Sequence, residues 1–288
     1  MKNILITGAT GNVGLEIIKS LKEQNSTDKI FAGVRNISKD DSTFERLGLE
    51  VVEFDFMNFD TQENALKGID SLFLLRPPQI AEVDKYFKPL IKIAQKMDVK
   101  HIIFLSVQGA EKNSFIPHHK IEKLIVESGI PYSFLRPAYF MQNFSTTLRE
   151  DLIHKKQIFL PAGKTKFTLI DVRDIGKVAA KILTNPTEYL NKSYELTCYE
   201  KLNFREMAEK LSKGLNEKIT YQAPNLLKFY FQKRKENVST IFILVMIMLH
   251  YLPRFQKEAE ITDWVEKITG NKPKTFDEFV AENIQTLR

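Results

Sequence analysis

The sequence predicts an α/β protein with a doubly wound parallel sheet and a small α+β C-terminal lobe. Short apolar runs alternate along its first half with segments that suit helices, and the connections between them are short. This alternation favours a parallel sheet with helices on both faces. The first apolar run also leads directly into a glycine-rich loop. Right-handed crossovers then place the ligand at the carboxyl ends of the strands.

The glycine-rich loop lies between a strand-like run, residues 1–7 (MKNILIT), and a helix-like segment, residues 14–24. One glycine permits the tight turn, one lets the backbone approach a phosphate, and one lets the helix pack closely on the strand. The N–H groups and the dipole at the helix start attract a pyrophosphate. We therefore expect a Rossmann-like dinucleotide site. Its cofactor-binding residues in this loop are Gly8, Thr10, Gly11, Asn12, Val13 and Gly14.

The other elements follow from apolar periodicity and from turn residues. Strands are expected at residues 29–34, 50–54, 71–75, 101–106, 132–135 and 166–170. Helices are expected at residues 61–68, 81–97, 117–128 and 139–154, and residues 40–48 (DDSTFERLG) are compatible with a further helix. Asp174 is expected to be the N-cap of a helix at residues 175–184.

The domain organisation follows from the absence of any linker, low-complexity segment or repeat in the sequence. We expect residues 1–155 to form the NAD(P)-binding core. Residues 156–288 are expected to supply the remaining core strands and helices and a small C-terminal substrate lobe, without an independent domain boundary. Beyond about residue 186 short strand-like runs mix with helices.

Composition narrows the class of protein. Hydrophobic residues make up 43% and charged residues 27% of the chain, as in ordinary soluble globular proteins. The net charge of +6 is scattered without a basic stripe, so nucleic acid is not an expected partner. The single cysteine, Cys198, excludes an intramolecular disulfide and a cysteine cluster for zinc, and we expect no metal site and a cytoplasmic location.

Neither a membrane partner nor a membrane segment is expected. The start of the chain lacks the pattern of a secretory signal. The longest apolar run, residues 241–249 (IFILVMIML), falls short of the roughly 20 residues that cross a bilayer, and we interpret it as a buried helix. The surrounding segment, residues 238–252, is apolar nearly all round and is expected to form the lid or wall of a cavity for an apolar substrate.

Arg35 indicates which dinucleotide binds. In an NAD site a carboxylate about 20 residues beyond the glycines binds the ribose 2′-hydroxyl. Here Arg35 stands 21 residues after Gly14, and its guanidinium suits a 2′-phosphate. NADP(H) is therefore the preferred cofactor and NAD(H) the alternative; Arg35 as a simple exposed loop charge is the competing interpretation. Topology alone adds five further cofactor-binding residues at strand ends: Asp55, Leu75, Arg76, Pro77 and Ser106.

Several motifs together resemble the NmrA-like group of atypical short-chain dehydrogenase/reductases. They are TGATGNVG, LLRPP, HHKIE, SGIPYSFLRPAYFMQNF, DVRDIGKVAA and TGNKPKTFDEF, and they span nearly the whole chain. The resemblance implies a Rossmann-type domain with a small C-terminal lobe and NADP(H) in the cleft. It also implies one of two functions. Some members reduce quinones, azo compounds or related acceptors, and others bind dinucleotide as redox sensors that regulate partner proteins.

The catalytic pair of most short-chain dehydrogenases is missing. None of the nine tyrosines is followed by lysine four residues later, which disfavours alcohol oxidation by the usual acid/base route. His118 and Glu122 occupy the corresponding helix, four residues apart and so on one face. An imidazole poised near neutrality between the helix dipole and Glu122 would donate a proton to a reduced acceptor. The alternative is a structural histidine held by Glu122.

The substrate pocket is expected after the sixth strand, where aromatic and methionine residues cluster. Its predicted residues are Tyr139, Phe140 and Asn143, although core packing is the commoner reason for such a cluster. We expect a reductase that passes hydride from NADPH to a small apolar or aromatic, quinone-like acceptor. The alternative is a non-catalytic NADP(H) sensor that acts through a regulatory protein partner. A monomer or a homodimer is expected.

Overall fold

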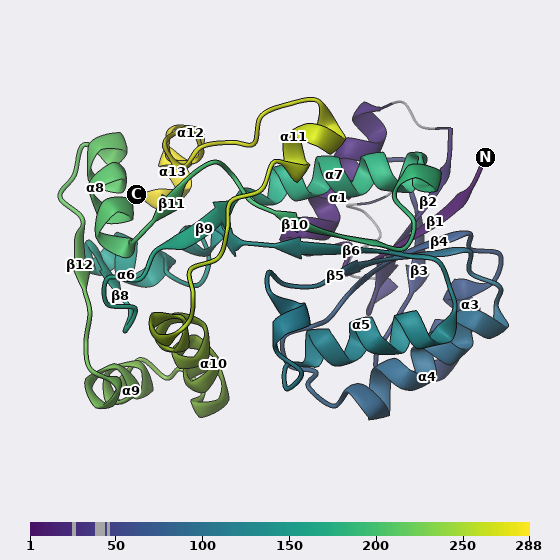
Figure 1. Ribbon diagram of the computed structural model, residues 1–288, viewed down its shortest axis with the longest axis horizontal. Helices are drawn as coiled ribbons and strands as arrows, with labels where there is room; N and C mark the ends of the chain where they lie inside the picture. The colour runs from purple at the N-terminus through teal and green to yellow at the C-terminus, as the bar shows by residue number, and fades with distance from the viewer. Residues whose placement is uncertain (25–26, 38–43, 45–46) are drawn as a thin grey trace. The chain divides into compact units, whose positions relative to one another are not determined.

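The computed structural model describes residues 1–24, 27–37, 44 and 47–288 (Figure 1). Most of the expected helix at residues 40–48 lies outside the described residues. The chain divides into two compact units, each built from three separate segments. The first unit comprises Met1–Pro137, Val172–Leu196 and Trp264–Asn271, and the second comprises Ala138–Asp171, Thr197–Asp263 and Lys272–Arg288. Residue 155, where the expected NAD(P)-binding core ends, lies within the second unit.

The first unit contains a seven-stranded sheet in the order β10-β6-β5-β4-β1-β2-β3, and every neighbouring pair in it is parallel. The strands are β1 (Asn3–Thr7), β2 (Lys29–Val34), β3 (Glu50–Glu53), β4 (Ser71–Leu75), β5 (His101–Leu105), β6 (Tyr132–Pro137) and β10 (Lys192–Leu196). The strand order reverses between β1 and β4, where ligands bind in doubly wound folds. The predicted Rossmann-like fold class is confirmed.

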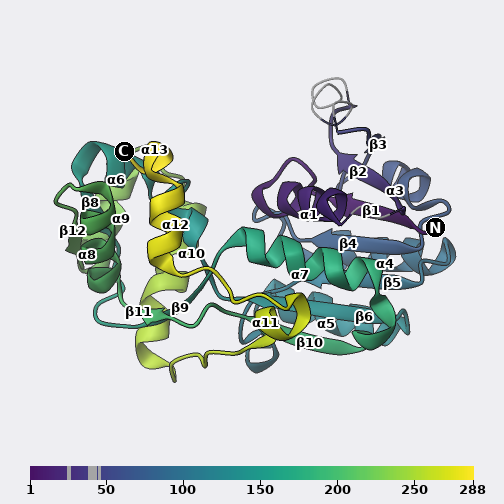
Figure 2. The same cartoon turned by 90° about the horizontal axis from the view of Figure 1, so that it is seen from above.

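Helices cover both faces of this sheet (Figures 1 and 2). One face carries α1 (Asn12–Glu23), α7 (Val172–Thr184) and α11 (Trp264–Thr269), and the other carries α3 (Phe59–Leu66), α4 (Val83–Lys96) and α5 (Pro117–Ser128). The helices α1 and α7 approach closely at Gly176. A Cβ atom at this position would lie only 2.7 Å from the carbonyl oxygen of Glu16, so a side chain would not fit there. The central strands are fully buried, which explains why they are apolar runs without alternation.

Two local predictions were wrong. The helix α7 begins at Val172, so Asp174 lies inside its first turn and is not the N-cap. The expected helix at residues 139–154 is instead a short strand β7 (Tyr139–Phe140), a 3-10 helix η2 (Met141–Phe144) and a helix α6 (Arg149–Lys155). The cause is non-local, since Tyr139 and Phe140 pair with Leu169 and Ile170.

The second unit is an α+β assembly with two small sheets. One sheet has the order β11-β9-β7, and the other pairs β12 with β8. Its strands and helices beyond β7, η2 and α6 are β8 (Gln157–Phe159), β9 (Phe167–Ile170), β11 (Lys201–Leu202), α8 (Phe204–Leu215), β12 (Thr220–Gln222), α9 (Leu226–Lys235), α10 (Thr240–Tyr251), the 3-10 helix η4 (Leu252–Phe255), α12 (Phe276–Glu282) and α13 (Ile284–Leu287). Phe144, Phe204, Phe229, Phe276 and Phe279 are buried in its core.

The helix α10 does not match the expected buried helix. Only three of its residues are buried: Ile243, Met246 and His250. The remaining apolar side chains are partly or largely exposed, so the apolar run is not explained by core packing alone. Within the described ranges no helix is long and apolar enough to cross a membrane.

Two histidines are buried as neutral groups. Nε2 of His101 lies 2.9 Å from the Ser133 hydroxyl, which itself donates to the carbonyl of Tyr189. Nδ1 of His250 lies 2.6 Å from the carbonyl of Met246 and donates to it. Burial lowers the pKa of His101 and that of His250, each to about 4.

These histidines predict a loss of stability in mild acid. Above pH 6.5 the imidazoles are neutral in both the folded and the unfolded chain. As the pH falls from about 6.5 to about 4, these histidines become protonated in the unfolded chain but stay neutral in the folded protein. The free energy of unfolding should therefore fall by up to about 1.4 kcal/mol per pH unit for each histidine.

Urea unfolding at several pH values measures this slope. His250→Gln should reduce the slope by about one proton. His154→Gln is the matched control because that side chain is 66% exposed, and it should leave the slope unchanged. An unchanged slope in His250→Gln would contradict the assignment.

Candidate functional site

The glycine loop leaves no room for side chains at two of its three glycines. Gly8 has a φ of +62°, and a Cβ atom there would lie 2.5 Å from Cδ2 of Leu75. A Cβ atom on Gly14 would lie 2.3 Å from the carbonyl oxygen of Gly8. The N–H of Gly11 donates to that same oxygen at 2.9 Å, which closes the turn. The loop therefore holds a tight turn that a larger residue at either position would distort.

The start of α1 is open to an anion. The N-cap is Gly11, which has no side chain and therefore no capping oxygen. The first turn of the helix contains no acidic residue. Thr10, Gly11 and Asn12 are exposed, whereas Val13 is buried beneath the turn. The first N–H groups of the helix thus face outward, together with the positive end of the helix dipole.

The loop is tied to the strand across the switch point. The Thr7 hydroxyl donates to the carbonyl of Phe73 at 2.9 Å, and the N–H of Leu75 donates to the Thr7 hydroxyl at 3.2 Å. Leu75 and Gly8 lie side by side. A cofactor-binding role for Leu75 stays a prediction. Pro77 follows two residues later and is half-buried.

Two predicted residues follow the neighbouring strands at the same edge of the sheet. Arg35 comes directly after β2 and is exposed, and among the described residues it contacts no carboxylate. Asp55 follows β3, and its carboxylate accepts from the N–H of Met57 at 2.8 Å. Among the described residues, therefore, no carboxylate engages Arg35, whereas one oxygen of Asp55 accepts a hydrogen bond in a turn.

Ser106 has a buried hydroxyl that nothing in the described part of the chain satisfies. It follows β5, is 2% exposed, and its backbone N–H donates to the carbonyl of Leu135. Its Oγ atom has no hydrogen-bond partner among the described residues. Leaving a buried hydroxyl unpaired is unfavourable, so this atom fits a polar group of a bound molecule.

His118 pairs with Arg76 rather than with Glu122. Nε of Arg76 donates to Nε2 of His118 at 3.5 Å, which places the imidazole proton on Nδ1. Burial, followed by the charge of Arg76, lowers the pKa of His118 to about 3. The expectation that Glu122 keeps this imidazole poised near neutrality is therefore wrong. His118 is a neutral group with an N–H at Nδ1 throughout the physiological range.

Arg76 also holds the loop that follows β4. One of its terminal nitrogens donates to the carbonyls of Pro77 and Pro78 at 3.1 Å and of Ile80 at 2.8 Å. Burial lowers the pKa of this guanidinium. No carboxylate pairs with Arg76 within the described ranges, so its positive charge is compensated only by carbonyl dipoles.

Glu122 belongs to a buried ion pair that the sequence did not reveal. Its two carboxylate oxygens accept from Nε and a terminal nitrogen of Arg136 at 3.0 and 2.7 Å. Arg136 also contacts Glu111 at 2.8 Å. The carboxylates hold the pKa of Arg136 above its ordinary value, against the opposing effect of burial. The sequence shows only a glutamate on a helix. The burial of Glu122, which implies a nearby cation, is visible only in the structure.

The predicted substrate-pocket residues lie in the second unit. The Tyr139 hydroxyl is 3.2 Å from Nε2 of His250, and its ring packs against Phe167 and Phe204. Burial raises the pKa of Tyr139 well above its ordinary range, so it is no acid at neutral pH. Phe140 and Asn143 are half-buried. A pocket role for the three residues stays a prediction.

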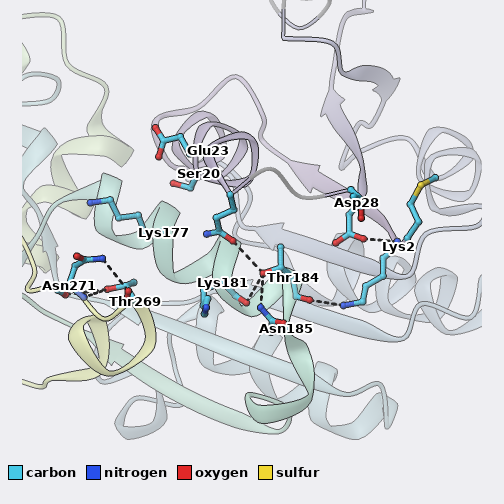
Figure 3. Close-up of a pocket in the computed structure, with 13 residues that line it drawn as sticks. Lys2, Ser20, Glu23, Asp28, Lys177, Lys181, Thr184, Asn185, Thr269 and Asn271 are labelled. Atoms are coloured by element: carbon cyan, nitrogen blue, oxygen red, sulfur yellow. Dashed lines mark hydrogen bonds between the residues drawn. The ribbon is translucent and has the colours of Figure 1, made fainter.

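A polar cavity of about 860 Å³ lies at the other edge of the first unit's sheet (Figure 3). It is lined by the amino ends of β1 and β2 and by the carboxyl ends of α1 and α7. Nζ of Lys2 donates there to the carbonyl of Thr184 at 2.9 Å. Lysines at helix carboxyl ends stabilise the exposed carbonyls, so this cavity has a structural explanation and is separate from the glycine loop. No group of three or more metal-ligating side chains occurs among the described residues.

A profile of the NmrA-like family matches residues 1–280. The chain belongs to the NmrA-like family. Prestalk A differentiation protein A of Dictyostelium discoideum is 30% identical over 287 residues, which cover 97% of this chain and 92% of that protein. An NAD(P)H azoreductase of Xenophilus azovorans is 29% identical, with 96% of each chain covered.

Among solved structures, the triphenylmethane reductase of a Citrobacter species in complex with NADP(H) superposes with a TM-score of 0.87. It is 24% identical, and 98% of this chain and 99% of that chain are covered. At this identity the likeness supports the fold of an NmrA-like protein along nearly its whole length.

The Glu122–Arg136 pair predicts a stability effect in this NmrA-like protein. Arg136→Met should cost about 3–5 kcal/mol of unfolding free energy, because it leaves the buried Glu122 carboxylate without its cation. Urea denaturation measures the loss. The double variant Glu122→Gln/Arg136→Met should recover part of it.

The matched control is Lys123→Met, which removes an exposed ion pair with Glu127 on the same helix. It should change stability by less than about 1 kcal/mol. Equal losses in Arg136→Met and Lys123→Met would contradict the importance of the buried pair.

Proposed function

We propose that this protein is an NADPH-dependent reductase that passes hydride to a flat, conjugated, apolar acceptor such as a quinone or an azo dye. The observation that carries the proposal is the open start of α1, together with Arg35 after β2, which contacts no carboxylate among the described residues. Gly8 and Gly14 hold the turn without side chains, and the first N–H groups of α1 remain open. These features suit a dinucleotide pyrophosphate, with Arg35 at the 2′-phosphate.

The remaining candidates fit the same cofactor. Ser106 offers an unpaired buried hydroxyl at the carboxyl edge of β5. Leu75 lies against the glycine loop and would border the cofactor. Asp55 follows β3 and would lie near the adenine. NADPH, when bound, supplies the hydride, and the chain supplies position and electrostatics.

The relatives support the acceptor class. The Xenophilus protein is named as an azoreductase that uses NAD(P)H, and the Citrobacter enzyme as a triphenylmethane reductase in complex with NADP(H). The first name refers to azo compounds and the second to triphenylmethane compounds. A small apolar or aromatic acceptor is therefore the proposed substrate of this chain, and Tyr139, Phe140 and Asn143 remain its proposed contacts.

His118 and Arg76 are the proposed polar groups of the reaction. An acceptor that receives hydride gains negative charge, and Arg76 holds a cation without a carboxylate partner among the described residues. Neutral His118 has an N–H at Nδ1 with which to donate a hydrogen bond to the negative charge that develops on the acceptor, and the acceptor takes its proton from water. Glu122, bound to Arg136, is a positioning residue in this scheme.

The second candidate is a non-catalytic NADP(H) sensor with a protein partner. It is favoured by the absence of a Tyr-x-x-x-Lys pair, and the 30% identical Dictyostelium relative is named for differentiation rather than for chemistry. The buried Cys198 thiol is compatible with the proposed cytoplasmic location. Tight NADPH binding without NADPH consumption across a broad panel of quinones and dyes would favour the sensor.

Arg35→Ala should weaken NADPH binding by about 10- to 100-fold, because a charge-assisted bond to the 2′-phosphate is lost. NADH binding should change by less than about threefold. Fluorescence titration of both nucleotides measures the two constants. Arg149→Ala removes an exposed arginine of the second unit and should leave both unchanged. Equal affinities of the wild-type protein for NADPH and NADH would overturn the cofactor assignment.

His118→Ala should slow the reduction of a quinone or azo dye by about 100-fold, the low end for loss of a positioned hydrogen-bond donor to developing negative charge. Because the pKa of His118 is about 3, the ratio of wild-type to variant kcat should stay constant from about pH 5 to 8. His119→Ala is the control, since Nδ1 of His119 bonds to the carbonyl of Ala110. A ratio that rises below pH 6.5 would instead indicate an imidazolium donor.

A further inference from the structure

We propose that α9, α10 and η4 form a docking surface for an anionic lipid membrane. The surface consists of exposed apolar side chains on these three helices, and we call it the apolar face. Its members are Leu227, Phe231, Ile241, Phe242, Leu244, Met248, Leu249, Leu252 and Phe255. All belong to the second unit.

The apolar face is continuous along α10. The buried residues Ile243, Met246 and His250 follow one another at intervals of three and four, and so line one side of the helix. The opposite side presents Ile241, Leu244, Met248 and Leu252 at the same intervals. The helix is therefore apolar on its outward side as well as on its inward side, and core packing accounts for only one of them.

The neighbouring helices extend the apolar face. The helices α9 and η4 both contact α10, and Figure 1 shows α9 beside α10. Leu227 and Phe231 of α9 are 72% and 60% exposed, and Phe255 of η4 is 71% exposed. Nine large apolar side chains exposed on one group of helices are more than scattered surface residues.

Exposed cations lie on the helices that carry the apolar face. Residues 226–260 contain six lysines and arginines and three acidic residues. Of the cations, Lys233 is buried and Lys257 pairs with Glu260, whereas Lys228, Arg234, Lys235 and Arg254 are exposed. The Glu236 carboxylate is bound by Lys155 and Lys233. Within the described ranges, Lys228 and Lys235 have no carboxylate partner. The guanidinium of Arg254 packs over the rings of Tyr251 and Phe255, which places a positive charge next to the apolar face.

This charge selects the occupant. A second copy of the chain, docked through the same surface about a two-fold axis, would bring lysines against lysines. A small acceptor would cover only part of three helices. An anionic lipid surface satisfies both features, because the apolar side chains enter the acyl boundary and the cations meet the headgroups. The twelve residues of α10 cannot span a bilayer, so the helix would lie in the plane of the interface.

Vesicle sedimentation with the full chain tests the proposal. The probes are vesicles of phosphatidylcholine alone and vesicles with about 30% phosphatidylglycerol. Binding to the anionic vesicles should be at least about tenfold stronger, and about 0.5 M salt should weaken it strongly. Because the readout is lipid binding, its failure is distinguishable from failure of the proposed reductase activity.

Two variants separate the apolar from the charged contribution. Ile241→Ser/Leu249→Ser should weaken binding at least about tenfold, because two insertable side chains are lost. Lys228→Gln/Lys235→Gln should weaken binding to anionic vesicles by about fivefold for each lysine. The control Phe115→Ser/Val126→Ser removes side chains that are 88% and 49% exposed in the first unit, and binding should be unchanged.

Three results would overturn the proposal. The first is no binding to either vesicle. The second is equal binding to both vesicles without salt dependence. The third is that Ile241→Ser/Leu249→Ser leaves vesicle binding intact but abolishes a dimer in sedimentation velocity or changes the KM for an acceptor, which would assign the apolar face to a second copy or to the substrate.

Discussion

The close approach of α1 to the carbonyl oxygen of Gly8 is the constraint on which the site depends. A single methyl group on Gly14 would come within 2.3 Å of that oxygen, so only glycine allows the helix to start directly beneath the strand end. The same turn directs the first N–H groups of α1 outward and sets Gly8 against Leu75. The outward-facing start of α1 at the switch point depends on this close contact between backbone atoms.

Among the described residues of the first unit, Arg136 pairs with carboxylates, whereas Arg76 does not. Arg136 is surrounded by Glu122 and Glu111 and stabilises the fold locally. Arg76 meets only carbonyl oxygens and a neutral imidazole among the described residues. Burial, followed by this positive charge, lowers the pKa of His118. The helix that replaces the usual tyrosine and lysine therefore offers a neutral donor beside a cation, which suits an acceptor that becomes negative.

The second unit combines a rigid aromatic core with an apolar exterior on α10. Phe144, Phe204 and Phe276 pack together inside it, and the pair of Tyr139 with His250 is buried and neutral. The side chains on the outward side of α10 are exposed and do not pack into that core. Reduction of an apolar acceptor is compatible with docking to a membrane surface, because lipid-soluble acceptors concentrate in the membrane where the apolar face would insert. The two proposals nevertheless rest on separate residues.

Local sequence was sufficient for the parallel sheet, for the glycine turn and for the family, because each depends on neighbouring residues whose spacing is visible in one dimension. The positions of Arg35 after β2 and of Leu75 at the end of β4 followed from the sequence, whereas the contact of Leu75 with Gly8 is a finding of the structure. Non-local contacts decided the rest. Pairing with β9 made Tyr139 and Phe140 a strand, Arg136 took the carboxylate expected near His118, and the packing of α10 left half of an apolar helix exposed. Sequence periodicity reports how apolar a segment is, whereas only tertiary packing decides which of its sides other residues cover.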